Sequence, residues 1–289
     1  MSKPPDNTAE HATPAEPSAA WPSLPLAAWQ DTYATVHMWT QIVGKIRLVQ
    51  TPWINHSWHV TQYVTARGLT TSPIPHGTRT FEIDFDFIDH QLVVRSSDGA
   101  RRTLALVPRA VADFYGELMS ILTELGLPVR IRTKPNEVER AIPFPSDREH
   151  HAYDADYMNR FWRILVQTDR VMKAFRARFL GKCSPIHFFW GSFDLAVTRF
   201  SGRTAPPHPG GVPNFPDWVA RTARDSQAVL NAASYKNLVQ QSVPRGKPTF
   251  RLEDPTFFQA IATQHLPPGP GPRITTQSAQ SYLGAADVR

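Results

Sequence analysis

The residues from 81 to 87 constrain the fold of this chain more than any others. Apolar and acidic residues alternate there: Phe81, Ile83, Phe85 and Phe87 are separated by Glu82, Asp84 and Asp86. A period of two is typical of a strand that buries one face. Candidate turns at 89–90 and 98–99 frame two further strand-like runs, 91–97 and 101–107. The sequence therefore predicts an antiparallel meander of three strands.

Turns of two residues at 89–90 and 98–99 would fix how these strands pair. Asp84 would then lie opposite Arg95, and Arg95 opposite Arg102. Paired carboxylates can serve as acid and base in glycoside hydrolysis, but cross-strand ion pairs explain this acidic face with fewer assumptions. We therefore expect the acidic row to be structural.

Three segments carry apolar residues at intervals of three and four, the spacing of helices with one packed face: 27–44, 109–125 and 155–179. Gly44 is expected to end the first helix, and Asp154 to cap the third. Further strands are expected at 58–67, 128–132 and within 187–200. Together these elements predict an α+β fold, an antiparallel β-sheet with helices packed on one face.

Length and composition favour one folded domain. The chain has 289 residues, of which 41% are hydrophobic, enough to bury a core. Residues 1–20 are rich in Pro, Ala, Ser and Thr and predict a disordered tail. Residues 206–289 are rich in Pro, Gln and Arg and predict a divergent, weakly structured tail, with a faint helix signal at 217–234. A single α+β domain is therefore expected at 21–205.

The cysteine content and the N-terminal residues indicate the cellular compartment of the protein. Cys183 is the only cysteine, which excludes an intramolecular disulfide and fits a reducing compartment. The first 20 residues include acidic side chains and lack the apolar core of a signal peptide. No apolar run reaches the roughly 20 residues that a membrane helix needs. We therefore expect a cytoplasmic protein without membrane contact, and its oligomeric state stays open.

The net charge of +6 says little about partners, because charge governs steering and solubility rather than activity. The third predicted helix carries a basic ridge: Arg160, Arg163, Arg170, Lys173 and Arg178. No Gly-rich phosphate loop or nucleic-acid motif accompanies the ridge, so nucleic acid is not the expected partner. The ridge instead supports an alternative function, a non-catalytic interaction module that binds an acidic partner.

The densest grouping of aromatic and polar residues lies at 182–203. A chain reversal at 190–191 would set His187 opposite Asp194, so that the carboxylate would orient and charge the imidazole. In a single long strand the two side chains would face opposite ways. The first geometry makes His187 a candidate base and Asp194 its orienter, as hydrolase-like chemistry requires. A core histidine with satisfied hydrogen bonds is the alternative.

Four residues follow one another at steps of four, so that a helix would stack them on one side: Tyr33, His37, Gln41 and Lys45. This stripe either lines a pocket or forms an ordinary exposed polar face. In the first case His37, Gln41 and Lys45 would bind a small-molecule ligand together with Trp190 and Arg199. The proline-broken segment 134–153 would form a surface loop or lid over it.

The sequence identifies no cofactor and predicts no metal site. His56 and His59 have the spacing of a metal-binding pair, but three residues apart along a strand they would point to opposite faces.

Three runs resemble an uncharacterised bacterial family, a catalogued domain of unknown function: 31–45, 65–75 and 181–196. The resemblance covers residues 21–211 and implies family membership without an activity, a cofactor or a catalytic residue. Family members continue beyond a Pro-Pro-x-Pro-Gly segment, here 206–210, into motifs of the Tyr-Ser-His-Glu and Gly-Phe-Trp-Pro-Gly types. Neither motif follows here, which predicts a divergent, truncated or frame-altered tail.

Overall fold

The computed structural model describes residues 20–200, 211–216 and 228–232. All of them belong to the first of the two units into which the chain divides, Met1–Pro248 and Thr249–Arg289. The predicted N-terminal tail therefore lies outside the described residues except for residue 20, as does most of the segment 206–289.

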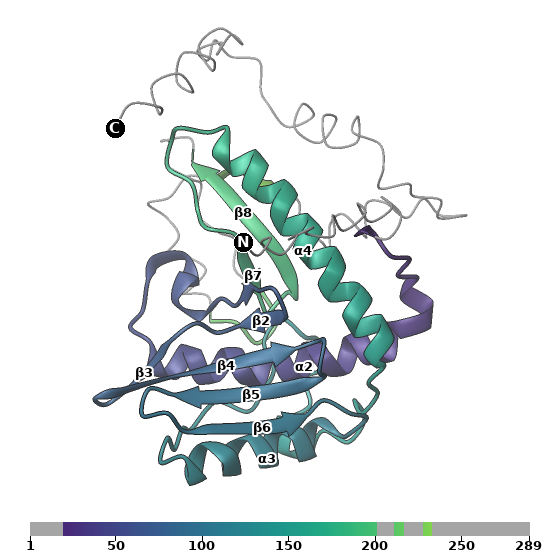
Figure 1. Cartoon of the computed structure of the whole chain (residues 1–289), viewed down its shortest axis with the longest axis vertical. Helices are drawn as coiled ribbons and strands as arrows, with labels where there is room; N and C mark the ends of the chain where they lie inside the picture. Colours follow the sequence, from purple (N-terminus) through teal and green to yellow (C-terminus); the bar gives the residue numbers. More distant parts are fainter. Residues whose placement is uncertain (1–19, 201–210, 217–227, 233–289) are drawn as a thin grey trace, which may run out of the picture. The chain divides into compact units, whose positions relative to one another are not determined.

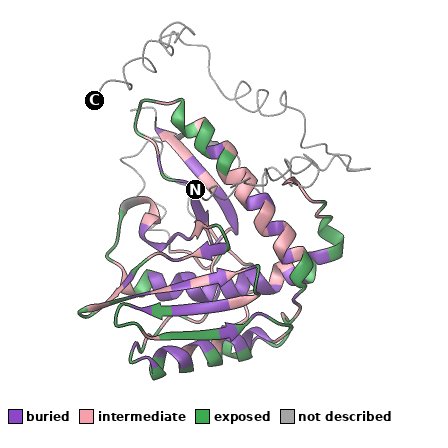
Figure 2. Ribbon diagram, viewed as in Figure 1, coloured by how far each residue is buried: buried purple, intermediate pink, exposed green. Residues whose placement is uncertain are grey.

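Helix α2 (Leu26–Gln50) is the most deeply buried helix, and Figure 2 shows it covered along most of its length. Val36, Trp39 and Ile42 are completely inaccessible. The prediction that Gly44 ends this helix is wrong, because the helix continues to Gln50. Gly44 has a packing role instead: a Cβ there would lie 2.2 Å from Nε1 of Trp190.

The main sheet has six strands in the order β1-β2-β4-β5-β6, with β3 paired to β4. The strands are β1 (Tyr63–Val64), β2 (Gly68–Thr70), β3 (Ile74–His76), β4 (Arg79–Asp86), β5 (Gln91–Ser96) and β6 (Arg101–Ala105). Every pairing is antiparallel. The predicted meander and the α+β fold class are thus confirmed.

The pairing register differs from the predicted one at both turns. Arg95 lies opposite Glu82 and Arg101 rather than opposite Asp84 and Arg102. The connection 87–90 between β4 and β5 is two residues longer than predicted. Because side chains alternate with a period of two, each side chain of these strands stays on the predicted face of the sheet. Arg95 still forms an ion pair with Asp84, diagonally across the strands, which agrees with a structural role for the acidic row.

A second sheet contains β7 (His187–Phe189), β8 (Asp194–Phe200) and β9 (Ala228–Ala232) in that order. The backbone of Gln62 pairs with that of Phe188 and joins this sheet to the segment before β1. Strand β9 occupies residues where the faint signal predicted helix, and residues 217–227 of that prediction lie outside the described part.

Helix α3 (Val111–Glu124) follows β6, and helix α4 (Ala155–Ala177) packs beside β8. Figure 1 shows α2 crossing behind the six-stranded sheet, with α3 beyond β6. Asp154 caps α4 as predicted, because its carboxylate accepts the backbone N–H of Tyr157 at 3.0 Å.

Two of the additional strand predictions are wrong. Residues 128–132 form no strand, and 58–67 contain part of a 3₁₀-helix, η1 (Asn55–Val60), followed only by the short strand β1. Another single 3₁₀ turn, η2 (Phe144–Ser146), interrupts the irregular segment before α4. Among the described helices, none is long and apolar enough to cross a membrane.

Candidate functional site

The polar stripe of α2 lies inside the protein. His37, Gln41 and Lys45 expose 8%, 0% and 2% of their surface, so the expectation of an ordinary exposed face is wrong. Tyr33, the first member, is partly buried and meets Phe193 edge to face at 5.0 Å. Buried polar groups need hydrogen-bond partners, and the partners come from two other parts of the chain.

The first partner is the connection between β7 and β8. His37 donates from Nε2 to the carbonyl oxygen of Gly191 at 2.8 Å. The indole of Trp190 packs on Gly44 and donates to the carbonyl oxygen of Val60 at 2.7 Å. This loop is thereby fixed against α2.

The second partner is residues 133–138, which we call the cover segment. Gln41 pairs with the main chain of Asn136 in both directions, donating to its carbonyl oxygen and accepting its N–H, each at 2.8 Å. Lys45 donates to the side-chain oxygen of Asn136. Glu137 accepts a hydrogen bond from Ser192 at 2.8 Å. The cover segment therefore closes the stripe off from solvent.

The far end of the cover segment is also fastened. Glu137 donates its N–H to the carbonyl oxygen of Pro213 at 2.8 Å, and Asn214 donates from its side chain to the carbonyl oxygen of Val138 at 2.9 Å. Glu137 has a φ of 58°, in the left-handed region that non-glycine residues rarely occupy. A loop residue under such backbone strain is held by its surroundings.

Lys45 is the most unusual member of the site. Its ammonium contacts the Asn136 side chain and lies 5.8 Å from the centre of the Trp190 ring. No carboxylate of the described residues forms an ion pair with it. Burial, and to a smaller extent the nearby charge of Arg132, lowers the pKa of Lys45 to about 8.

The predicted pairing of His187 with Asp194 is wrong. The connection between β7 and β8 spans 190–193, so Ala196 lies opposite His187, and Phe189 lies opposite Asp194. Burial, and next the charge of Arg47, lowers the pKa of His187 to about 4, whereas a charging carboxylate would raise it. Asp194 instead lies near Tyr33, where burial and this carboxylate raise the pKa of the phenol.

His187 lies among aromatic residues. Its Nδ1 is 2.9 Å from Oγ1 of Thr61, and its ring centre is 5.4 Å from that of Trp58 and 5.6 Å from that of Tyr63. Its Nε2 is buried and has no hydrogen-bond partner among the described residues. This environment favours the neutral imidazole.

The buried His187 predicts a stability change with pH. Its pKa is about 4 in the folded state against 6.5 in the unfolded chain, so the unfolded chain binds the proton more tightly. Stability is therefore full above pH 6.5 and falls as the pH drops toward 4, by about 2 kcal/mol between pH 7 and 5. Urea titrations at both pH values should show a smaller loss in His187→Gln.

The matched control for this pH effect is His151→Gln, because His151 is exposed. Burial lowers the pKa of His56, His59 and His90 as well, so wild type also loses stability through them. Only the difference between wild type and His187→Gln reports on His187. An identical loss of stability in wild type and His187→Gln would contradict the role of His187 in this pH dependence.

Arg199 does not join the other predicted ligand residues. It donates to the carbonyl oxygen of Phe175, and its guanidinium lies 3.3 Å from the centre of the Phe175 ring and 5.2 Å from that of Phe179. These contacts tie β8 to the end of α4, which indicates a packing role.

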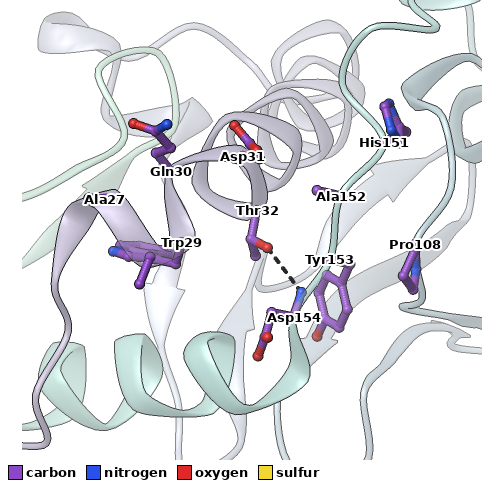
Figure 3. A pocket seen from close by; sticks show the side chains of 11 residues that line it. Ala27, Trp29, Gln30, Asp31, Thr32, Pro108, His151, Ala152, Tyr153 and Asp154 are labelled. Carbon is purple, nitrogen blue, oxygen red and sulfur yellow. Dashed lines mark hydrogen bonds between the residues drawn. The ribbon is translucent and has the colours of Figure 1, made fainter.

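The described cavities lie away from the α2 stripe. One, of about 370 Å³, is bordered by the start of α2 and by 151–154. Figure 3 shows its polar groups, which include Asp31, His151 and Asp154, with the Asp154 N–H donating to Thr32 Oγ1 at 3.0 Å. Another, of about 220 Å³, lies between β1 and α4. Within the described ranges, no three His, Cys, Asp or Glu side chains gather to hold a metal ion.

The sequence pattern indicates the stripe and Trp190, but it does not indicate Asn136 and Glu137 or the contact of Ser192 with Glu137. The broken pattern of 134–153 does predict a loop or lid, and Gly191 marks a close approach, since a Cβ there would lie 2.1 Å from Oε1 of Glu137. Neither signal identifies which residues meet.

Comparison with known proteins gives a family and no activity. Residues 21–232 match a family model described as "Family of unknown function (DUF5996)", which confirms the predicted resemblance and extends it beyond residue 211. No curated protein and no solved structure matches.

Proposed function

The chain belongs to this family of unknown function, and we propose that it binds a small organic anion beneath the cover segment, with Lys45 as the receiving cation. One observation carries the proposal: a lysine that is 2% exposed has only neutral hydrogen-bonding and aromatic contacts among the described residues. An ionised ammonium buried without a counter-charge costs several kcal/mol. A bound anion would remove that cost.

The contacts of Asn136 suggest what the ligand contains. Gln41 binds both the main-chain N–H and the main-chain carbonyl oxygen of Asn136, and Lys45 binds the side-chain oxygen, which lies three bonds from the same Cα. A small molecule with an amide N–H and a carboxylate on the same carbon, and a second carboxylate one carbon further, would make the same three contacts, with a charged oxygen in place of the neutral side-chain oxygen. An acylated acidic amino acid is such a compound.

Binding requires the cover segment to move, because it fills the space over the stripe. The strained backbone of Glu137 favours this motion, since release of a left-handed residue recovers on the order of 1 kcal/mol. The cover segment then acts as the lid expected at 134–153.

N-acetylaspartate tests the proposal by isothermal titration calorimetry. We expect binding that weakens at least tenfold in Lys45→Met, since a hydrogen bond to a charged group contributes about 1.5–3 kcal/mol. The anion should also raise the lowered pKa of Lys45, so that binding takes up protons at pH 8.5 and much less at pH 6.5. Titrations in buffers of different ionisation enthalpy measure that uptake.

Lys134→Met is the matched control, because Lys134 is an exposed lysine of the same segment. It should keep both affinity and proton uptake. If wild type fails to bind N-acetylaspartate and shorter carboxylates at millimolar concentration, or binds them without proton uptake at pH 8.5, the proposal is wrong.

Hydrolysis is not included in the proposed function, because the β7–β8 register offsets His187 from Asp194. Binding of an acidic partner by the basic ridge also has weaker support. Arg160 and Lys173 each pair with an aspartate one turn earlier, both at 2.5 Å. Pairs of this kind reduce the charge that the ridge offers a partner.

A further inference from the structure

The cavity of about 220 Å³ between β1 and α4 is independent of the Lys45 site. Tyr63 and Val64 come from β1, and Pro185 and Ile186 come from the segment before β7. Three charged residues of α4 complete the lining: Asp169, Lys173 and Arg176. The volume is below the 300 Å³ or more of a pocket for drug-sized molecules, so the cavity suits a compact ligand.

Arg176 offers this cavity an exposed cation that one hydrogen bond orients. Its Nε donates to the carbonyl oxygen of Ser184 at 2.8 Å, which anchors the guanidinium plane. Its two terminal nitrogens have no hydrogen-bond partner among the described residues. A planar fork that is already held loses little freedom when it binds, and it matches the two oxygens of a carboxylate or phosphate.

The other charges leave the cavity with a positive balance. Lys173 and Asp169 form an ion pair at 2.5 Å, so they largely offset each other. Arg176 then contributes the net charge. The carboxylate of Asp169 is occupied by the lysine, which leaves the guanidinium available to an anion.

The opposite wall is mostly apolar. Tyr63 is held from the interior by Arg47, whose guanidinium lies 5.5 Å from the ring centre, and by the neighbouring ring of His187. Ile186 is buried, and Pro185 fixes the chain beside it. An apolar body placed here would pack against ordered side chains.

We propose that this cavity binds one aromatic acid, with its carboxylate or phosphate on Arg176 and its ring against Tyr63, Pro185 and Ile186. The proposal does not depend on the Lys45 site, which requires a different ligand and a moving cover segment. Carboxylates and phosphate monoesters share the chemistry that Arg176 recognises, and the experiment separates them.

The test is titration of the full-length protein with benzoate, phenyl phosphate and inorganic phosphate. Binding is measured by calorimetry and by ligand-observed NMR. We expect one equivalent of benzoate or phenyl phosphate to bind, and inorganic phosphate to bind at least tenfold more weakly because it lacks the ring. Arg176→Gln should weaken binding of the aromatic acid at least tenfold. The affinity of Arg176→Lys should lie between those of wild type and Arg176→Gln, because lysine keeps the positive charge but cannot donate two parallel hydrogen bonds.

Arg170→Gln is the matched control, since Arg170 is exposed on the same helix and its Nη1 donates to Gln167. It should bind like wild type. Circular dichroism of each variant separates lost binding from lost folding. The proposal is overturned if no aromatic acid binds, if inorganic phosphate binds as well as phenyl phosphate, or if Arg176→Gln and Arg176→Lys bind normally. Binding that is lost in Lys45→Met alone would assign these anions to the other site.

Discussion

Replacing Gly44 by alanine is expected to lower the free energy of unfolding by about 2–6 kcal/mol. The new methyl group would lie 2.2 Å from Nε1 of Trp190, so the indole must move. Overpacking of this kind costs about 1–3 kcal/mol. The moved indole also loses its hydrogen bond to Val60, and a buried donor without a partner costs another 1–3 kcal/mol.

The control for Gly44→Ala is Gly116→Ala, in which the same change is made inside helix α3. A Cβ at Gly116 meets nothing within 4 Å, so this variant should gain about 0.5–1 kcal/mol from helix propensity. Urea unfolding followed by circular dichroism measures both. If the clash with Trp190 causes the loss, Gly44→Ala should destabilise a Trp190→Phe background less than it destabilises wild type. Equal stability of the two alanine variants would refute it.

Replacing Trp39 by alanine is expected to cost about 3–5 kcal/mol, the range for a large aromatic residue in a core. Trp39 is completely buried, and its ring stacks on Phe114 at 4.7 Å and on Tyr153 at 5.5 Å. It therefore joins α2 to α3 and to the segment that leads into α4. Its removal should weaken both contacts at once.

Trp53→Ala provides the comparison, because Trp53 is 47% exposed. Its cost should stay within about 1 kcal/mol. Far-UV circular dichroism is the appropriate probe, since both variants change the tryptophan fluorescence. A loss below 1 kcal/mol in Trp39→Ala would show that the stacked rings contribute little to the fold.

The elements that the sequence predicts well are those that carry their own local signal. The alternation from 81 to 87 gives β4, and Asp154 with the apolar spacing behind it gives the start of α4. The sequence predicts the pairing register less well, because register depends on turn length: the connection 87–90 is longer than Asp89-His90 alone, and 190–193 is longer than Trp190-Gly191.

Gly44 shows why the site could be predicted only in part. Glycine usually ends a helix, and nothing nearby in the sequence reveals that Trp190 needs the space. Likewise the stripe of α2 has the spacing of an exposed face, and its burial depends on Asn136 and Gly191, which are far along the chain. Local patterns give the helix; tertiary contacts decide which of its faces meets water.

The two-way pairing of Gln41 with Asn136 has a consequence for the order of folding. The contact joins positions 95 residues apart, and closing so long a loop costs entropy before any contact repays it. The hairpins of the main sheet, whose partners are near neighbours in sequence, form ahead of it. We therefore expect the Lys45 compartment to be enclosed after these hairpins, and its opening to leave a ligand a route in without disrupting the sheet.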